Sequence, residues 1–165
     1  MAYLLDTNIF IDAKNRYYAF DIVPSYWPKL LRAFQAGKVL TIDAVATEIE
    51  EGDDDFVAWF KANINRKNGL VWESKADITV VSCYQAVAQL VMDNQQYSDP
   101  FKGEFLSGAD PWLISAAKAG NHIVATNEVM SGPTTKRVKI PDICQQMSVP
   151  YVDVFEMMRK TNIVV

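Results

Sequence analysis

Four acidic residues stand where an active site on an α/β sheet would need them. Asp6 follows one short apolar run, and Glu128 closely follows another. Glu48 lies one turn into a helical pattern, and Asp110 opens a second one. Because strand ends and adjoining helix starts meet in a crevice at one edge of such a sheet, we expect the four side chains to converge. Converging carboxylates repel one another and offer the oxygen ligands that Mg²⁺ or Mn²⁺ prefers.

A divalent cation held by these acids would support hydrolysis of a phosphodiester bond. The cation would relieve the repulsion, attract the phosphate and lower the pKa of a bound water, and two ions about 3.5–4 Å apart would stabilise attacking and leaving oxygens together. We expect Asp6 and Asp110 to be direct ligands. Glu48 would bind metal directly or through water, or would orient the nucleophile. Glu128 is a candidate ligand of a second ion.

Neighbouring polar residues suit supporting roles. The side chains of Asn8 and Thr126 suit hydrogen bonds that orient the carboxylates. Two basic groups flank the acidic motifs, and we expect them to contact phosphates: Lys14 and Arg16 in one, and Lys136, Arg137 and Lys139 in the other. The alternative for these cations is ordinary solvated charge.

Each acid also has an ordinary structural interpretation. Asp6 could be a turn or cap residue, and Asp110 could simply cap its helix. Glu48 could be a solvated helix residue and Glu128 an ordinary loop acid. The functional interpretation rests on their joint placement along one edge of one sheet.

The elements that must position these residues follow from the hydrophobic periodicity. Short apolar runs predict strands near 2–5, 39–42, 122–126 and 150–152. Helical patterns predict helices near 8–14, 25–36, 44–51, 54–66, 77–95, 110–119, 141–147 and 154–160, with long loops at 97–108 and 127–140. Strands separated by helices predict an α/β fold, a three-layer α/β/α sandwich around a central, mainly parallel sheet.

Composition sets the remaining bounds. A chain of 165 residues, half of them apolar, is most simply one domain over residues 1–165. No run is long enough to cross a membrane, and the N-terminus lacks the pattern of a signal peptide. Cys83 and Cys144 have no metal-ligand spacing, which favours reduced packing residues in a cytoplasmic protein. The net charge of −4 neither indicates nor excludes a nucleic-acid partner.

The sequence gives less support to catalysis by histidine or serine and to nucleotide binding by a P-loop. The single histidine, His122, leaves no pair of histidines for metal-free RNA cleavage and no Ser-His-Asp set, so we expect it to be structural or exposed. No glycine-rich P-loop is present. The aromatic residues between Tyr17 and Trp27 are interpreted as covering the core or a partner surface, and the alternative is stacking on unpaired bases.

Nearly the whole chain, from about Ala2 to about Val154, resembles a PIN domain. The resemblance rests on Leu4-Leu5-Asp6-Thr7-Asn8, on Glu48 with Gly52 four residues on, on Ala109-Asp110-Pro111-Trp112-Leu113-Ile114, and on Thr126-Asn127-Glu128. The opening and the Ala-Asp-Pro-Trp motif resemble a bacterial branch of that family in particular. The chain departs from the common pattern at the last segment, which usually reads Thr-x-Asp, so Glu128 adds a methylene to the fourth ligand position.

The resemblance implies a metal-dependent ribonuclease, because many PIN relatives are the toxins of bacterial toxin–antitoxin pairs. Such proteins use three or four acids to hold Mg²⁺ or Mn²⁺ and cleave RNA. It also implies an antitoxin protein as partner and a possible homodimer. Two alternatives stay open: a PIN-like module that binds RNA or protein with weak or no catalysis, and a phosphatase on a similar sheet, in which Asp6 would attack phosphorus.

Overall fold

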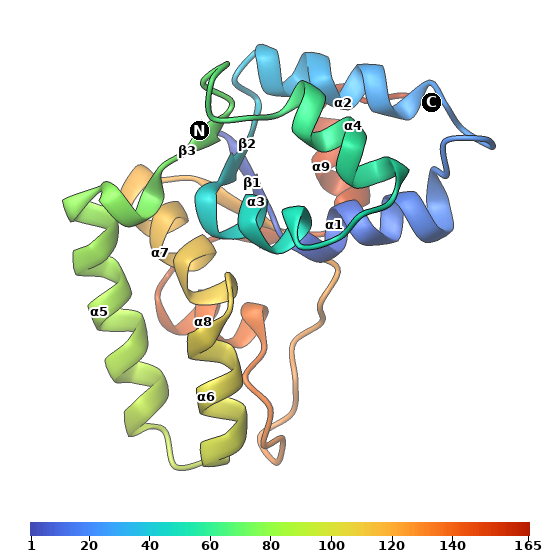
Figure 1. Ribbon diagram of the computed structural model, residues 1–165. Coiled ribbons are helices and arrows are strands. Elements are labelled where there is room, and N and C mark those ends of the chain that lie inside the picture. Colours follow the sequence, from blue (N-terminus) through green and yellow to red (C-terminus); the bar gives the residue numbers. More distant parts are fainter.

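A parallel sheet of five strands forms the centre of the protein. The computed structural model describes all 165 residues (Figure 1). The strands are β1 (Tyr3–Leu5), β2 (Val39–Ile42), β3 (Val71–Trp72), β4 (Ile123–Ala125) and β5 (Tyr151–Val152). Their order is β3-β2-β1-β4-β5, and every pairing is parallel. This is the α/β architecture and the PIN-like topology that the sequence predicts.

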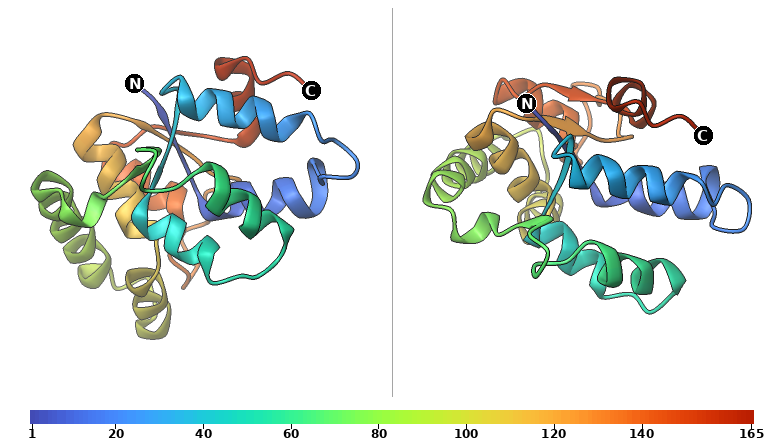
Figure 2. Two further views of the ribbon diagram at one scale, coloured as in Figure 1. Left: turned by 45° about the horizontal axis from the view of Figure 1, so that its top comes forward. Right: turned by 90° about the horizontal axis from the view of Figure 1, so that it is seen from above.

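Nine α-helices and two short helical turns connect the strands. The helices are α1 (Thr7–Asp12), α2 (Tyr26–Gln35), α3 (Asp43–Glu50), α4 (Asp55–Asn63), α5 (Ile78–Asp93), α6 (Asp99–Ser107), α7 (Asp110–Gly120), α8 (Ile140–Gln146) and α9 (Val154–Thr161), with a π-helical turn η1 (Ala13–Tyr17) and a 3₁₀ turn η2 (Ser74–Ala76). Seen from above in Figure 2, α5 and α7 lie on one side of the sheet, and α1 and α2 lie on the other.

The central strands are apolar because helices cover both of their faces. Leu4 and Leu5 of β1 are completely buried, as are Val39 and Ile42 of β2. A strand buried on both faces needs a continuous apolar run rather than alternation, which is the pattern that these short segments show. The buried apolar side chains form one contiguous cluster of 41 residues, so a single core supports all five strands.

The aromatic residues between Tyr17 and Trp27 pack into and over this core. Tyr26 and Trp27 are fully buried. Tyr18 stacks on Tyr26 with ring centroids 4.2 Å apart, and Phe20 stacks on Trp27 at 4.4 Å. The interpretation that these residues cover the core is therefore confirmed for these four.

The structure corrects two element predictions. Residues 97–108 are not a loop, because α6 occupies Asp99–Ser107. Its start carries a helix signal, Ser98 followed by Asp99 and Pro100, but Gly103 and the surrounding polar residues weaken the periodicity. The second correction is strand β3, whose two residues, Val71 and Trp72, lie outside the predicted strands. The loop at 127–140 is confirmed up to Lys139, and α8 begins at the next residue, Ile140.

Residues outside the acidic motifs have the structural roles that the sequence suggests. The ring nitrogen Nδ1 of His122 accepts a hydrogen bond from the backbone of Ala2 at 3.0 Å, and its ring packs edge-on against Trp72. Cys83 and Cys144 are free thiols, and Cys144 is buried. No helix is long and apolar enough to cross a membrane.

Candidate active site

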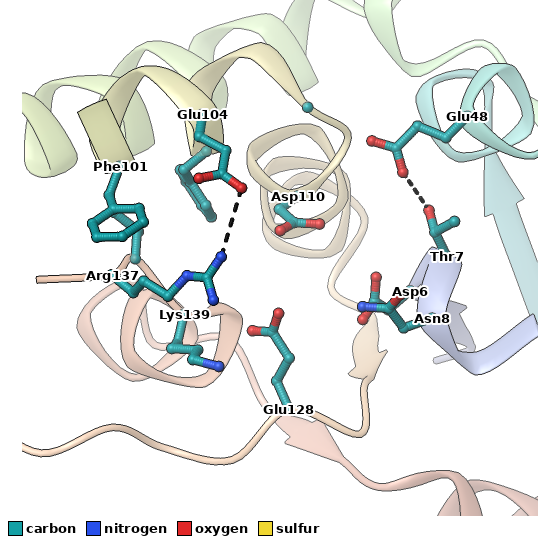
Figure 3. Close-up of a pocket in the computed structure, with 13 residues that line it drawn as sticks. Asp6, Thr7, Asn8, Glu48, Phe101, Glu104, Asp110, Glu128, Arg137 and Lys139 are labelled. Atoms are coloured by element: carbon teal, nitrogen blue, oxygen red, sulfur yellow. Dashed lines mark hydrogen bonds and ion pairs between the residues drawn. The ribbon is translucent and has the colours of Figure 1, made fainter. Parts of the chain in front are cut away.

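The four predicted acids line one pocket at the carboxyl edge of the sheet. Asp6 follows β1, Glu48 lies on α3, Asp110 is the first residue of α7, and Glu128 follows β4. The cavity has a volume of about 450 Å³, and Figure 3 shows the side chains of Asp6, Asp110 and Glu128 directed towards its interior. Residues more than 120 positions apart in the sequence thus share one site, because β1 lies between β2 and β4.

The register of β1 against β4 brings Asp6 beside Thr126. Leu5 pairs with Ala125, so the residues that follow them, Asp6 and Thr126, also lie side by side. The Thr126 hydroxyl donates a hydrogen bond to Oδ2 of Asp6 at 3.0 Å and accepts one from the backbone N–H of Glu128 at 3.1 Å. The predicted hydrogen bond between Thr126 and a carboxylate is therefore present. Asn8 lines the pocket, but its side chain makes no hydrogen bond to a carboxylate.

Glu48 connects two segments that flank the pocket. Its Oε2 accepts a hydrogen bond from the Thr7 hydroxyl at 2.7 Å, and its Oε1 accepts one from the backbone N–H of Ala109 at 2.9 Å. A Cβ atom at position 108 would lie 3.4 Å from Oε1, so Gly108 leaves room for this close approach. Both carboxylate oxygens accept hydrogen bonds from the protein, and the predicted role of Glu48 towards a metal ion or the nucleophile stays a prediction.

One carboxylate oxygen of Glu128 accepts a hydrogen bond from the protein, and the other accepts none. Its Oε2 accepts a hydrogen bond from the backbone N–H of Ile140 at 2.8 Å, at the first residue of α8. This bond satisfies one of the unpaired N–H groups at the start of the helix. The extra methylene relative to Asp lets the carboxylate reach from the end of β4 to α8 while still lining the pocket.

Burial and mutual repulsion disfavour the charged forms of the two aspartates. Asp6 is only 2% exposed. Burial raises its pKa from 3.8 to about 7, with the Thr126 hydrogen bond opposing the shift and the charge of Glu128 adding to it. Burial also raises the pKa of Asp110, to about 8, and the charges of Asp6 and Glu128 contribute. Such an environment is characteristic of functional sites, because it costs stability that a purely structural role would not require.

The donor set fits a hard divalent cation. Carboxylate oxygens are the ligands that Mg²⁺ and Mn²⁺ prefer, and a positive ion would relieve the repulsion between Asp6 and Asp110. No three or more acidic, cysteine or histidine side chains are grouped so that together they could hold a metal ion, so a cation here would be bound by fewer protein ligands and by water. Mg²⁺ commonly takes one or two carboxylates and completes its coordination with water, and the polar pocket has room for both.

The opposite wall of the pocket carries positive charge and aromatic surface. Arg137 and Lys139, from the loop after β4, line it together with Phe101 of α6. The Arg137 guanidinium lies 5.2 Å from the centroid of the Phe101 ring and 3.8 Å from the carboxylate of Glu104.

The other predicted phosphate contacts lie elsewhere. Lys14 forms an ion pair with Asp54, the N-cap residue of α4, and it does not line the pocket. Arg16 and Lys136 are exposed and also lie outside the lining residues. These three cations therefore do not line the pocket, and their contact with the phosphates of a longer RNA stays a prediction.

Several residues that line the pocket are not among the predicted site residues: Thr7, Phe101, Glu104, Phe105, Gly108 and Val138. Phe101, Glu104 and Phe105 lie on α6, where the sequence predicts a loop. The Asp99-Pro100 pair, which matches the Asp110-Pro111 start of α7, is the signal that could have identified this helix.

Comparison with known proteins gives one match. The family model described as "Domain of unknown function (DUF4411)" matches residues 3–165. No curated protein and no solved structure matches the chain.

Proposed function

Because the chain belongs to the DUF4411 family, whose description assigns no chemistry, we propose a function from the site itself: metal-dependent hydrolysis of RNA phosphodiester bonds. The observation that carries this proposal is the pair Asp6 and Asp110. Two carboxyl groups with pKa values raised to about 7 and about 8 face one polar pocket at the carboxyl edge of a parallel sheet. The resemblance to PIN domains supports the choice of RNA as substrate.

Each acid has a distinct part in the proposed reaction. Asp6 and Asp110 would hold Mg²⁺ or Mn²⁺, which when bound neutralises the pocket, attracts phosphate and lowers the pKa of water. Glu48 keeps the start of α1 and the start of α7 at a fixed separation through its two hydrogen bonds. The free oxygen of Glu128 faces the same pocket and can bind a second ion or accept the proton of the attacking water. Thr126 holds the carboxylate of Asp6 in place.

The biological context is proposed from the resemblance alone. We propose that the protein is the toxin of a type II toxin–antitoxin pair, that it acts in the cytoplasm, and that it can form a homodimer. A short reading frame beside its gene that encodes a small DNA-binding or antitoxin protein would support the toxin assignment. Growth arrest on expression, relieved by co-expression of that neighbour, would test it directly.

The decisive experiment is cleavage of a pool of structured and unstructured RNAs by purified protein. The reactions contain Mn²⁺, Mg²⁺ or a chelator, and the Asp6→Asn variant is compared with Asp93→Asn, a matched change at an exposed residue at the end of α5. We expect metal-dependent cleavage that is lost in Asp6→Asn and kept in Asp93→Asn. RNA binding without cleavage by folded protein would instead indicate a binding module. Release of phosphate from small phosphomonoesters would indicate a phosphatase.

A further inference from the structure

The active-site pocket has two chemically different halves. Its acidic half holds Asp6, Glu48, Asp110 and Glu128, whereas the opposite half is formed by α6 and the loop after β4. Figure 3 shows Phe101, Arg137 and Lys139 together on that second side, facing the carboxylates across the cavity. A substrate that spans the pocket must therefore bind at one end to the acids, or to cations that they hold. At its other end it must bind to an aromatic, positively charged wall.

The guanidinium of Arg137 lies over the ring of Phe101, so two flat groups stand together on this wall. The guanidinium group lies 5.2 Å from the ring centroid, which is within the range of a cation–π contact. Phe101 is only partly buried, and the paired Glu104 and Arg137 side chains are 65% and 58% exposed. The ion pair between them, at 3.8 Å, is consequently weak and leaves donors of Arg137 available. Flat aromatic and guanidinium surfaces of this kind are the groups on which proteins stack nucleobases.

The loop that carries Arg137 is hydrogen-bonded to the segment that precedes α6. The backbone N–H of Ser98 donates to the carbonyl of Lys136 at 3.2 Å, and the side-chain amide of Gln96 donates to the carbonyl of Thr135 at 3.1 Å. At its start, Ser131 donates to Asp142 of α8 at 2.8 Å. These contacts hold the wall in place, so the stacking surface is already formed.

We propose that Phe101 and Arg137 form a nucleoside subsite of the active-site pocket. One unpaired base of the substrate stacks on this pair, and the adjoining phosphate is bound by Lys139 and by the free donors of Arg137, next to the acidic half. A cavity of about 450 Å³ accommodates a single nucleotide rather than a base pair. The proposal rests on the proposed function and narrows it: recognition requires the base itself, not only the charged backbone.

Binding of a fluorescent mononucleotide tests this subsite without relying on catalysis. The probe is 2-aminopurine riboside 5′-monophosphate in the presence of Mg²⁺, which contains no phosphodiester bond and whose fluorescence falls when its base stacks. We expect quenching on binding to the wild type, with little competition from ribose 5-phosphate. Phe101→Leu should weaken binding about tenfold and abolish most of the quenching. Phe155→Leu, at a partly exposed phenylalanine on α9, is the matched control and should bind as the wild type does.

A second variant separates stacking from charge. Arg137→Lys keeps the positive charge but removes the planar group, and this exposed side chain can be changed without disturbing the core. We expect the variant to lose quenching while the salt dependence of binding is retained. Equal affinity and equal quenching in the wild type, Phe101→Leu and Arg137→Lys would overturn the subsite, even if the wild type cleaves RNA. Base-dependent binding without RNA cleavage under any condition would overturn the proposed function and leave the subsite standing.

Discussion

The hydroxyl group of Thr126 donates a hydrogen bond to the carboxylate of Asp6, 3.0 Å away, although 120 residues separate the two in the sequence. Both side chains are buried, with exposed fractions of 1% and 2%. The contact exists because β1 and β4 are parallel neighbours in register, with Leu5 opposite Ala125. The same hydroxyl also accepts a hydrogen bond from the backbone N–H of Glu128. A single side chain therefore contacts the acids that follow two neighbouring strands.

Replacement of Thr126 by valine should therefore weaken metal binding. Valine preserves the shape but cannot donate to Asp6 or accept from Glu128, and loss of such a supporting partner typically costs about 10–100-fold in metal affinity. Titration with Mn²⁺, followed by the melting temperature or by calorimetry, measures the change. Thr126→Ser restores the hydroxyl and should restore most of the affinity. An unchanged Mn²⁺ affinity in the valine variant would mean that the hydrogen bond from Thr126 does not support metal binding.

Mn²⁺ should stabilise the folded protein through Asp110. A ligand that binds only the native state stabilises it by about 2.7 kcal/mol at a hundred times its Kd, so the wild-type melting temperature should rise by several degrees. Asp110→Asn should remove most of this rise, whereas Asp93→Asn should keep it. The Asp110→Asn protein should also be more stable than the wild type in chelator, because it no longer buries that carboxylate. A full Mn²⁺ shift in this variant would place the metal elsewhere.

Stability of the metal-free protein should fall as the pH rises. The pKa values of Asp6 and Asp110 in the folded chain, about 7 and about 8, lie above the unfolded value of 3.8. The native state therefore holds more protons than the unfolded state between these values, and stability declines through this window by up to about 1.4 kcal/mol per pH unit for each group.

Chemical denaturation in chelator between about pH 5 and pH 9 measures this dependence. Saturating Mn²⁺ should flatten or reverse it, because metal ligands must be deprotonated. Asp110→Asn should show a shallower decline than the wild type. A metal-free protein whose stability rises steadily with pH over this range would contradict the raised pKa values.

Glu48→Gln should destabilise the fold. Both oxygens of Glu48 accept hydrogen bonds, from the hydroxyl of Thr7 and from the backbone of Ala109. An amide offers only one acceptor and turns an N–H towards the other donor, so we expect a loss of about 1–3 kcal/mol in the free energy of unfolding. Glu104→Gln, on the opposite wall and highly exposed, should change stability little. Similar unfolding free energies for the two variants would show that Glu48 does not connect the segments.

Glu128→Gln should preserve the fold and lower cleavage. The amide oxygen can still accept a hydrogen bond from the backbone N–H of Ile140, so this N–H group at the start of α8 keeps its partner. The variant loses the second, negatively charged oxygen that faces the pocket, and we expect a reduction of about tenfold or more in Mg²⁺-dependent activity. Full activity in a folded Glu128→Gln protein would exclude this residue as an essential ligand or base.

The acids and the strands that carry them could be identified from local sequence. Asp6 and Glu128 follow apolar runs, and Asp110 precedes a proline at the start of a helix, which are signals within a few neighbouring residues. An all-parallel sheet also follows from strands separated by helices, since such connections place each strand in the same direction. The convergence of the four carboxylates in one pocket was predictable for this reason.

Long-range packing decided the remainder of the site. Nothing near Lys14 in the sequence indicates that it pairs with Asp54, and nothing near Arg137 indicates that it stacks on Phe101. Helix α6, whose local pattern is weak, packs against α5 and α7, and the Lys102 ammonium donates a hydrogen bond to the carbonyl of Met92 at 2.8 Å. The sequence alone determined the class of fold and the acidic edge, because both depend on short-range patterns. Only the tertiary structure decided which cations and aromatic residues face the acids, because those contacts depend on how distant segments pack around a shared core.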